Sequence, residues 1–258
     1  MSSSASSPES AATAATSTTS PTEGVLWVTT SILNKDLPES LIHEWYREHS
    51  LDVLNCPGNG GLFLRYKNVD SSINLYSDPN FAGRFAPSTT LDVVANAQWP
   101  FLALVKLTDL AWLISQQFID MPRVSKVLPP QADGSLGSAF DAWNAGLRSY
   151  ETVNRVEGTS SGTGRPQYIL SVQTEEASGP VFEELEKTYS TLPGFRRSVS
   201  YKLAPGFLEF QEPGPLPQGL ALYEFDGDQP PSPSTSGKHI KADVWTLISE
   251  QGDLSLNV

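Results

Sequence analysis

The sequence is poor in the residues that form disulfides and metal sites. Its 258 residues include one cysteine, Cys56, and three histidines, at positions 43, 49 and 239. A single cysteine closes no intrachain disulfide and supplies no CxxC pair, which favours a reducing compartment. The histidines show neither HxH nor HxxxH spacing, and those are the spacings typical of zinc ligands. We therefore expect no metal site.

Basic residues are also scarce, and long apolar runs are lacking. Lys and Arg total 17 against 29 Asp and Glu, which gives a net charge of −12. This charge repels nucleic acid and anionic lipid, so neither is an expected partner. No window approaches ~18 consecutive apolar residues, so the sequence predicts no membrane-spanning helix.

The first 22 residues consist almost wholly of Ser, Ala, Thr and Pro. They have neither the basic start nor the apolar core of a secretory signal, and the lack of Arg argues against a mitochondrial presequence. We interpret residues 1–22 as a disordered tail and expect a cytoplasmic protein.

Apolar bulk is plentiful, and two similar halves are predicted. Six Trp, eight Tyr and eleven Phe are enough for a sizeable core. The order strand, helix, strand, strand, helix, strand is expected at residues 24–30, 37–54, 62–69, 101–107, 108–118 and 148–155. The same order is expected again at residues 168–174, 178–189, 195–203, 220–225, 238–250 and 254–258.

Short sequence echoes support this repeat. Pro-Gly followed by Tyr-Lys occurs at 57–58 and 66–67 and again at 193–194 and 201–202, and Leu-Ala-Leu occurs at 102–104 and 220–222. Leu-Ile-Ser-Gln at 113–116 answers Leu-Ile-Ser-Glu at 247–250, each four residues after an aspartate. We infer a tandem duplication of a ferredoxin-like α+β unit, with repeats at 23–157 and 167–258.

The two repeats are expected to form one barrel. A four-stranded sheet with both helices on one face leaves its other face bare, so two such sheets gain by packing together. We therefore predict a single-chain version of a dimeric α/β-barrel, with residues 158–166 as the linker between the repeats. The alternative is that the Gly-rich run 158–164 is a loop within one domain.

The helix predicted at 37–54 carries the candidate catalytic group. At ~100° per residue, His49 falls at the centre of an apolar face that also holds Trp45, Tyr46 and Asp52. An unsatisfied ring nitrogen there costs ~1 to 3 kcal/mol, so it needs a hydrogen-bond partner or a cavity beside it. Asp52 and Tyr46 are the predicted partners. The alternative is a hydrogen-bonded core histidine that ties the helix to a strand.

These segments carry a family resemblance. The sequences WYREHSLDV at 45–53, RYKNVD at 65–70, FLAL at 101–104 and DLAWL at 109–113 resemble the fungal branch of the EthD-like dimeric α/β-barrel proteins. The resemblance covers residues 24–156. The rest of the chain is related to the family only through the internal repeat. Ser50, the long segment at 70–100 and the lack of a histidine in the second-half helix depart from the family pattern.

The resemblance implies a cofactor-free barrel in which the first-helix histidine faces a pocket for a hydrophobic or aromatic small molecule. A neutral imidazole at His49 would move a proton next to a carbonyl, with Asp52 orienting the ring. Tyr46, Arg65 or Tyr66 would donate to the developing enolate oxygen, although strand neighbours point to opposite sides and only one of the last two can face the pocket. The predicted substrate-binding residues are Trp45, Arg65, Tyr66 and Trp99.

We therefore predict a cofactor-independent lyase, isomerase or cyclase of fungal-type secondary metabolism, acting on a polyketide-like or conjugated carbonyl compound. Two alternatives stay open: a cofactor-free monooxygenase of phenols, and a non-catalytic binding or stress protein for hydrophobic small molecules. We expect one working pocket per chain and either a monomer or a homodimer. A lid formed by residues 77–87 and Trp99 is a further interpretation, against simple loop packing.

Overall fold

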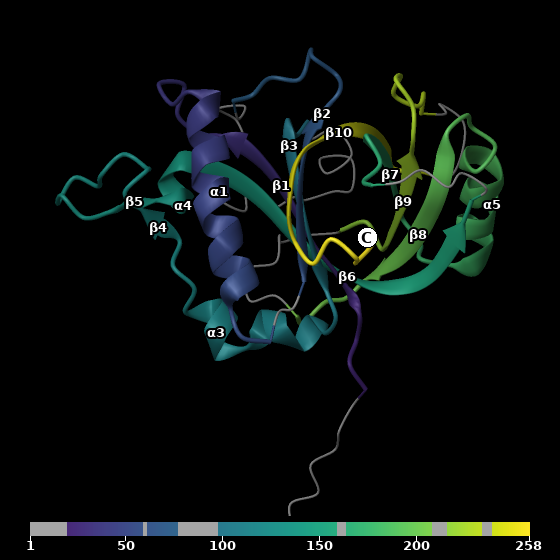
Figure 1. Ribbon diagram of the computed structural model, residues 1–258, viewed down its shortest axis with the longest axis horizontal. Helices are drawn as coiled ribbons and strands as arrows, with labels where there is room; N and C mark the ends of the chain where they lie inside the picture. The colour runs from purple at the N-terminus through teal and green to yellow at the C-terminus, as the bar shows by residue number, and fades with distance from the viewer. Residues whose placement is uncertain (1–19, 59–60, 77–97, 159–163, 208–215, 234–238) are drawn as a thin grey trace, which may run out of the picture.

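A closed barrel of eight antiparallel strands forms the centre of the protein (Figure 1). The structure is a computed structural model that describes residues 20–58, 61–76, 98–158, 164–207, 216–233 and 239–258. The strand order around the barrel is β1-β3-β2-β10-β7-β9-β8-β6. The strands are β1 (Gly24–Ile32), β2 (Leu62–Asn68), β3 (Phe101–Leu107), β6 (Trp143–Glu157), β7 (Tyr168–Thr174), β8 (Phe195–Leu203), β9 (Gly219–Phe225) and β10 (Lys241–Gly252).

Each half of the barrel has the strand order of a ferredoxin-like unit. In both halves the fourth strand lies beside the first: β6-β1-β3-β2 in the first half and β10-β7-β9-β8 in the second. The halves join where β2 pairs with β10 and β6 pairs with β8. The long strand β6 belongs to both halves of the barrel, because its first part pairs with β1 and its last part with β8. The predicted α+β fold, two ferredoxin-like repeats closed into one barrel, is confirmed.

The second half differs from the prediction at its end. Residues 241–252 form the strand β10, although we expected a helix over 238–250, and the expected closing strand at 254–258 is not a strand. The branched residues Val244, Thr246 and Ile248 alternate along β10, a pattern that suits a strand better than a helix. The two similar Leu-Ile-Ser sequences therefore lie in different structures, one at a helical turn and one in a strand, and their similarity is a coincidence.

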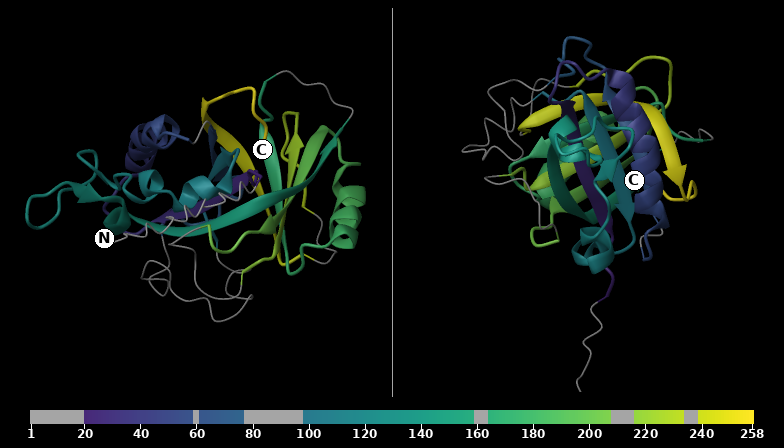
Figure 2. Two further views of the ribbon diagram at one scale, coloured as in Figure 1. Left: turned by 90° about the horizontal axis from the view of Figure 1, so that it is seen from below. Right: turned by 90° about the vertical axis from the view of Figure 1, so that its left-hand side faces the viewer.

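Two longer helices cover the outside of the barrel. Helix α1 (Glu39–Asn55) lies across the first half and α5 (Gly179–Tyr189) across the second, as the two views in Figure 2 show. The Ser50 hydroxyl donates to Gln251 Oε1 at 2.8 Å and so fastens α1 to β10 as well. No helix in the described ranges is long and apolar enough to cross a membrane.

The segment between β3 and β6 takes the place of a second helix in the first half. The predicted helix at 108–118 is split into η2 (Leu110–Ile114) and α3 (Gln116–Ile119), each started by a side-chain cap, from Asp109 and Ser115. A small hairpin follows, β4 (Val124–Ser125) with β5 (Gly137–Ser138), and then the single turn α4 (Ala139–Ala142). This segment packs beside α1 and is tied to it by a 2.8 Å hydrogen bond from the Ser125 hydroxyl to Glu48.

Three apolar clusters follow from this arrangement. One fills the barrel and includes Trp27, Tyr66, Tyr150, Tyr201 and Trp245, and two others lie under α1 and under α5. The expected tail lies largely outside the described residues, in 1–19. The expected lid at 77–87 and the centre of the expected linker at 159–163 lie outside them entirely.

Candidate active site

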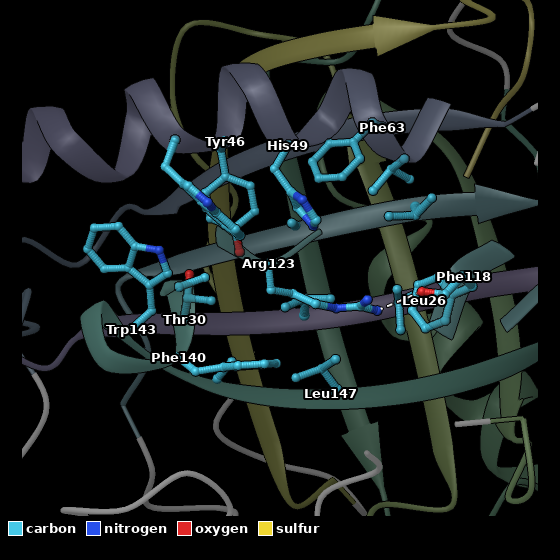
Figure 3. A pocket seen from close by; sticks show the side chains of 17 residues that line it. Leu26, Thr30, Tyr46, His49, Phe63, Phe118, Arg123, Phe140, Trp143 and Leu147 are labelled. Atoms are coloured by element: carbon cyan, nitrogen blue, oxygen red, sulfur yellow. Dashed lines mark hydrogen bonds between the residues drawn. The ribbon is translucent and has the colours of Figure 1, made fainter. Parts of the chain in front are cut away.

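A cavity of about 110 Å³ lies between α1 and the outer face of the first-half sheet (Figure 3). Its wall is mostly apolar, as is usual for small-molecule sites. The residues that line it are Leu26, Val28, Thr30, Trp45, Tyr46, His49, Val53, Phe63, Ala103, Val105, Phe118, Arg123, Ala139, Phe140, Trp143, Ala145 and Leu147.

Local periodicity explains which residues reach the cavity. Alternate residues of a strand point to one face, so Leu26, Val28 and Thr30 of β1 all point outward toward α1. On the helix, Trp45, His49 and Val53 follow each other at four-residue steps and form one stripe. The cavity lies where this stripe crosses the small side chains of Ala103 and Ala145.

His49 points from α1 into the cavity (Figure 3). Its imidazole stacks on the Trp45 indole, with ring centroids 4.5 Å apart and planes 15° from parallel. Within the described part of the chain, neither ring nitrogen makes a hydrogen bond, so the picture of a hydrogen-bonded core histidine does not fit. Burial lowers the pKa of His49 to about 4, and the charge of Arg123 acts in the same direction. The imidazole is therefore neutral near pH 7.

Arg123 is the charged residue beside His49, and the sequence reasoning missed it. Its Nη2 donates to the Phe118 carbonyl and its Nη1 to the Ile119 carbonyl, both at 2.8 Å, and Nη1 also donates to the Met121 carbonyl. These carbonyls lie at or just beyond the C-terminal end of α3, the negative end of the helix, which attracts cations. The sequence feature that could have indicated Arg123 is its position four residues after the end of a short capped helix. Burial lowers the pKa of Arg123 from its ordinary value, but a guanidinium is effectively always protonated in proteins.

Tyr46 forms the wall between the cavity and a buried arginine. Its ring meets Trp45 edge-to-face at 4.7 Å on one side, and the Arg65 guanidinium lies 4.0 Å from its centroid. Burial raises the pKa of Tyr46, although Arg65 and the Thr30 hydroxyl act in the opposite direction. The phenol therefore keeps its proton at neutral pH and can act as a hydrogen-bond donor.

Asp52 does not reach the cavity. Its side chain is exposed, and in the described structure no hydrogen bond joins it to His49. Three residues along a helix turn the side chain by about 300°, which carries Asp52 to the solvent edge, whereas four residues bring Val53 back to the cavity side. The pKa of Asp52 is raised by partial burial and by Glu48, not lowered by an imidazolium. The expected pairing of Asp52 with His49 is not formed.

Of the four predicted binding residues, only Trp45 lines the cavity. Arg65 and Tyr66 point to opposite sides of β2 as expected, but neither reaches the cavity, because Phe63 occupies the lining position on this strand. Arg65 lies beyond Tyr46, where its Nη1 donates to His43 Nδ1 at 3.1 Å. Tyr66 is inside the barrel, and Trp99 packs against that interior cluster rather than the cavity.

Several aromatic lining residues had no signal in the sequence. Phe118 and Phe140 come from the irregular segment between β3 and β6, and Trp143 is the first residue of β6, where that segment ends; no periodic pattern assigns their direction. In the part of the chain that the structure describes, no three His, Cys, Asp or Glu side chains gather closely enough to hold a metal ion.

Comparison with known proteins finds a similar protein from a fungus. It matches no family model. It is 25% identical over 252 residues to core atranone cluster (CAC) protein 1 of Stachybotrys chlorohalonatus (strain IBT 40285), an alignment that covers 89% of this chain and 92% of that protein. The chain is thus similar to a fungal cluster protein along nearly its whole length.

Two solved structures are similar to this chain at low sequence identity. An anthrone oxidase-like protein has a TM-score of 0.46 and 12% identity, covering 90% of this chain and 94% of that chain. A mutant chlorite dismutase of Candidatus Nitrospira defluvii has a TM-score of 0.40 and 13% identity, covering 81% of this chain and 78% of that chain.

Proposed function

We propose that this protein is a cofactor-independent enzyme of fungal secondary metabolism, in which His49 moves a proton on a hydrophobic carbonyl or phenolic compound. The observation that carries the proposal is a neutral imidazole that faces a cavity and has no hydrogen-bond partner within the described residues. The similarity to a fungal cluster protein supports the biosynthetic role. The EthD-like motif around residues 45–53 supports the same interpretation.

The chemistry requires one base in a dry site. The lone pair of His49 takes a proton from the carbon next to a carbonyl, and the electron pair of the broken C–H bond moves to the carbonyl oxygen. The imidazolium then returns the proton at another position, which isomerises the substrate, or gives it to a departing group, which makes the enzyme a lyase. Tyr46 holds its proton and is the neutral donor on α1 for the intermediate's oxygen.

Trp45 and the apolar wall support this role physically. The stack against Trp45 limits how the imidazole can turn, so the base is oriented before the substrate arrives. Burial keeps the imidazole unprotonated, because an imidazolium would lose hydration without gaining a carboxylate partner among the lining residues. His49 is thus ready to accept a proton over the whole range near neutral pH.

The test is turnover of the metabolite that accumulates when the gene is deleted from its source organism. Purified wild type, His49→Gln and the matched control His239→Gln, in the other half of the barrel, receive that metabolite in air and under argon. We expect His49→Gln to lose at least about 100-fold in rate, the usual contribution of a general base, with both variants folded by circular dichroism. His239→Gln is expected to match the wild type.

Each other outcome has a definite meaning. Full turnover by folded His49→Gln would contradict the proposal. Turnover that stops under argon would assign the monooxygenase reaction to the same base. A metabolite that binds and is recovered unchanged would make the protein a carrier rather than an enzyme.

A further inference from the structure

The charge of the cavity wall is unusual. Among the described lining residues, Arg123 is the one that carries a charge at neutral pH, and no carboxylate lines the cavity with it. The titratable groups facing inward are Tyr46 and His49 from α1 and Arg123 from the segment after α3. The lining residues of β1, β2, β3, β6 and α4 do not titrate. The cavity is therefore positive inside a protein whose net charge is −12.

The charge of Arg123 is held in place without being neutralised. Its three acceptors are backbone carbonyls, which orient the guanidinium but carry no net charge. Glu48, the nearby carboxylate of α1, accepts its hydrogen bond from Ser125 instead, and no carboxylate contributes to the pKa of Arg123. In the described structure, the Arg123 Nε makes no hydrogen bond.

A second donor in the wall also lacks an acceptor. The indole Nε1 of Trp143 is buried and has no hydrogen-bond partner in the described structure. Figure 3 shows Trp143 on one side of His49 and the Arg123 guanidinium on the other. Buried donors without acceptors are costly, and a ligand with oxygen atoms satisfies them. The wall thus has unpaired donors and no anionic acceptor.

We infer that this cavity binds its ligand as an oxyanion: a phenol or enol whose ionised oxygen faces Arg123 while its ring packs on the aromatic wall. The inference rests on the site of the proposed function and narrows its substrate to weakly acidic, ring-containing compounds. When such a ligand enters as a neutral phenol, its O–H bond breaks, the electron pair stays on oxygen, and the proton passes to His49. Burial holds His49 unprotonated and the charge of Arg123 adds to this effect; the bound anion offsets the field of Arg123 and so makes the transfer easier.

A small matched pair of probes tests the inference. 4-Nitrophenol has one ring, which suits a cavity of about 110 Å³, and its absorbance reports whether it is ionised. 4-Nitroanisole is the control, because its methyl group prevents ionisation. With the wild-type protein we expect phenolate absorbance at pH values where free 4-nitrophenol is still protonated, and at least about tenfold weaker binding of 4-nitroanisole.

Variants assign the effect to Arg123. Arg123→Gln is expected to lose the phenolate absorbance and about tenfold in affinity for 4-nitrophenol, with 4-nitroanisole binding unchanged. Arg123→Lys keeps the charge and should keep most of the phenolate preference, which separates charge from any structural role of the carbonyl contacts. Loss of the preference in Arg123→Lys while 4-nitroanisole still binds would overturn the role of charge.

The wild-type measurement alone can overturn the inference, so it does not depend on any variant folding. Wild type that binds 4-nitrophenol only in its neutral form, or binds 4-nitroanisole equally well, contradicts it. If His49→Gln is inactive in that case, the proposed function stands without this inference. Arg123-dependent phenolate binding together with a fully active His49→Gln would reject the proposed base and keep the oxyanion site.

Discussion

The imidazole of His49 and the indole of Trp45 lie nearly parallel, with centroids 4.5 Å apart, one helical turn from each other on α1. This stack covers one face of the imidazole and leaves its edge toward the cavity. The edge carries both nitrogens, so the contact that buries the ring also presents its lone pair. The stack adds to the burial that lowers the pKa of His49, and it leaves the lone pair free for the proton transfer proposed above.

Stability is expected to depend on pH through His49. The pKa of this group is about 4 in the folded protein and near 6.5 unfolded, so the unfolded state binds the proton more strongly. The stabilising contribution is complete above about pH 6.5 and is lost as pH falls toward 4, by roughly 3 kcal/mol in all. Urea unfolding at a series of pH values, with wild type and His49→Gln compared, measures it. Identical pH curves for the two proteins would contradict the low pKa.

Activity is expected to depend on the protonation of the same group, and in the same direction. In the proposed mechanism the neutral imidazole is the base, so turnover is expected to rise as pH increases through about 4 and then to stay level across neutrality. A rate profile of kcat/KM against pH provides the measurement. An inflection near the ordinary histidine pKa of ~6.5 would show that His49 is solvated in the working enzyme.

Trp45 should control both the position and the pKa of His49. Trp45→Phe keeps an aromatic ring but shortens the stack, and we expect a folded protein with reduced turnover and a higher His49 pKa by NMR titration. Trp45→Ala leaves a large cavity under α1 and should cost about 3 to 5 kcal/mol of unfolding free energy. An unchanged His49 pKa in Trp45→Phe would show that the stack does not set it.

A variant of Asp52 tests whether this carboxylate orients His49, as the helical pattern predicted, or has no part in the site, as its exposed position indicates. Because its side chain is exposed, we expect Asp52→Asn to retain turnover within about twofold and stability within about 0.5 kcal/mol. Steady-state kinetics and thermal unfolding provide both values. A loss approaching that of His49→Gln would mean that the carboxylate orients the imidazole after all.

The barrel interior offers a test of the fold rather than the site. Arg197 on β8 and Glu224 on β9 form a buried ion pair with Nε and Oε2 2.5 Å apart. Arg197→Met should cost about 3 to 5 kcal/mol, because it leaves a carboxylate without its partner, whereas the double variant with Glu224→Gln should recover part of that loss. Burial already raises the pKa of Glu224. Equal stability of the single and double variants would show that the pair does not couple.

Local patterns were sufficient for most of the strands and for the two main helices. Short apolar runs predicted β1, β2 and β3, with alternation along β2, and the helical stripe of Trp45, His49 and Val53 placed the imidazole on the buried side of α1. These features depend on residues close together in the chain, because side-chain direction repeats every two residues in a strand and every 3.6 in a helix. The repeat likewise came from the order of such elements.

The remaining features depend on which surfaces meet, and periodicity carries no information about that. Leu-Ile is helical at 113–114 and part of a strand at 247–248, since only the second lies beside a strand, β2, that needs a partner. On β2 the cavity is lined by Phe63, whereas Arg65 packs against α1 on the other side of Tyr46 and so lies outside the cavity. Arg123 comes near His49 only because an irregular segment folds back against α1. Side-chain direction is a local property, whereas the crossing point of a helix and the path of a loop are decided by packing across the whole barrel.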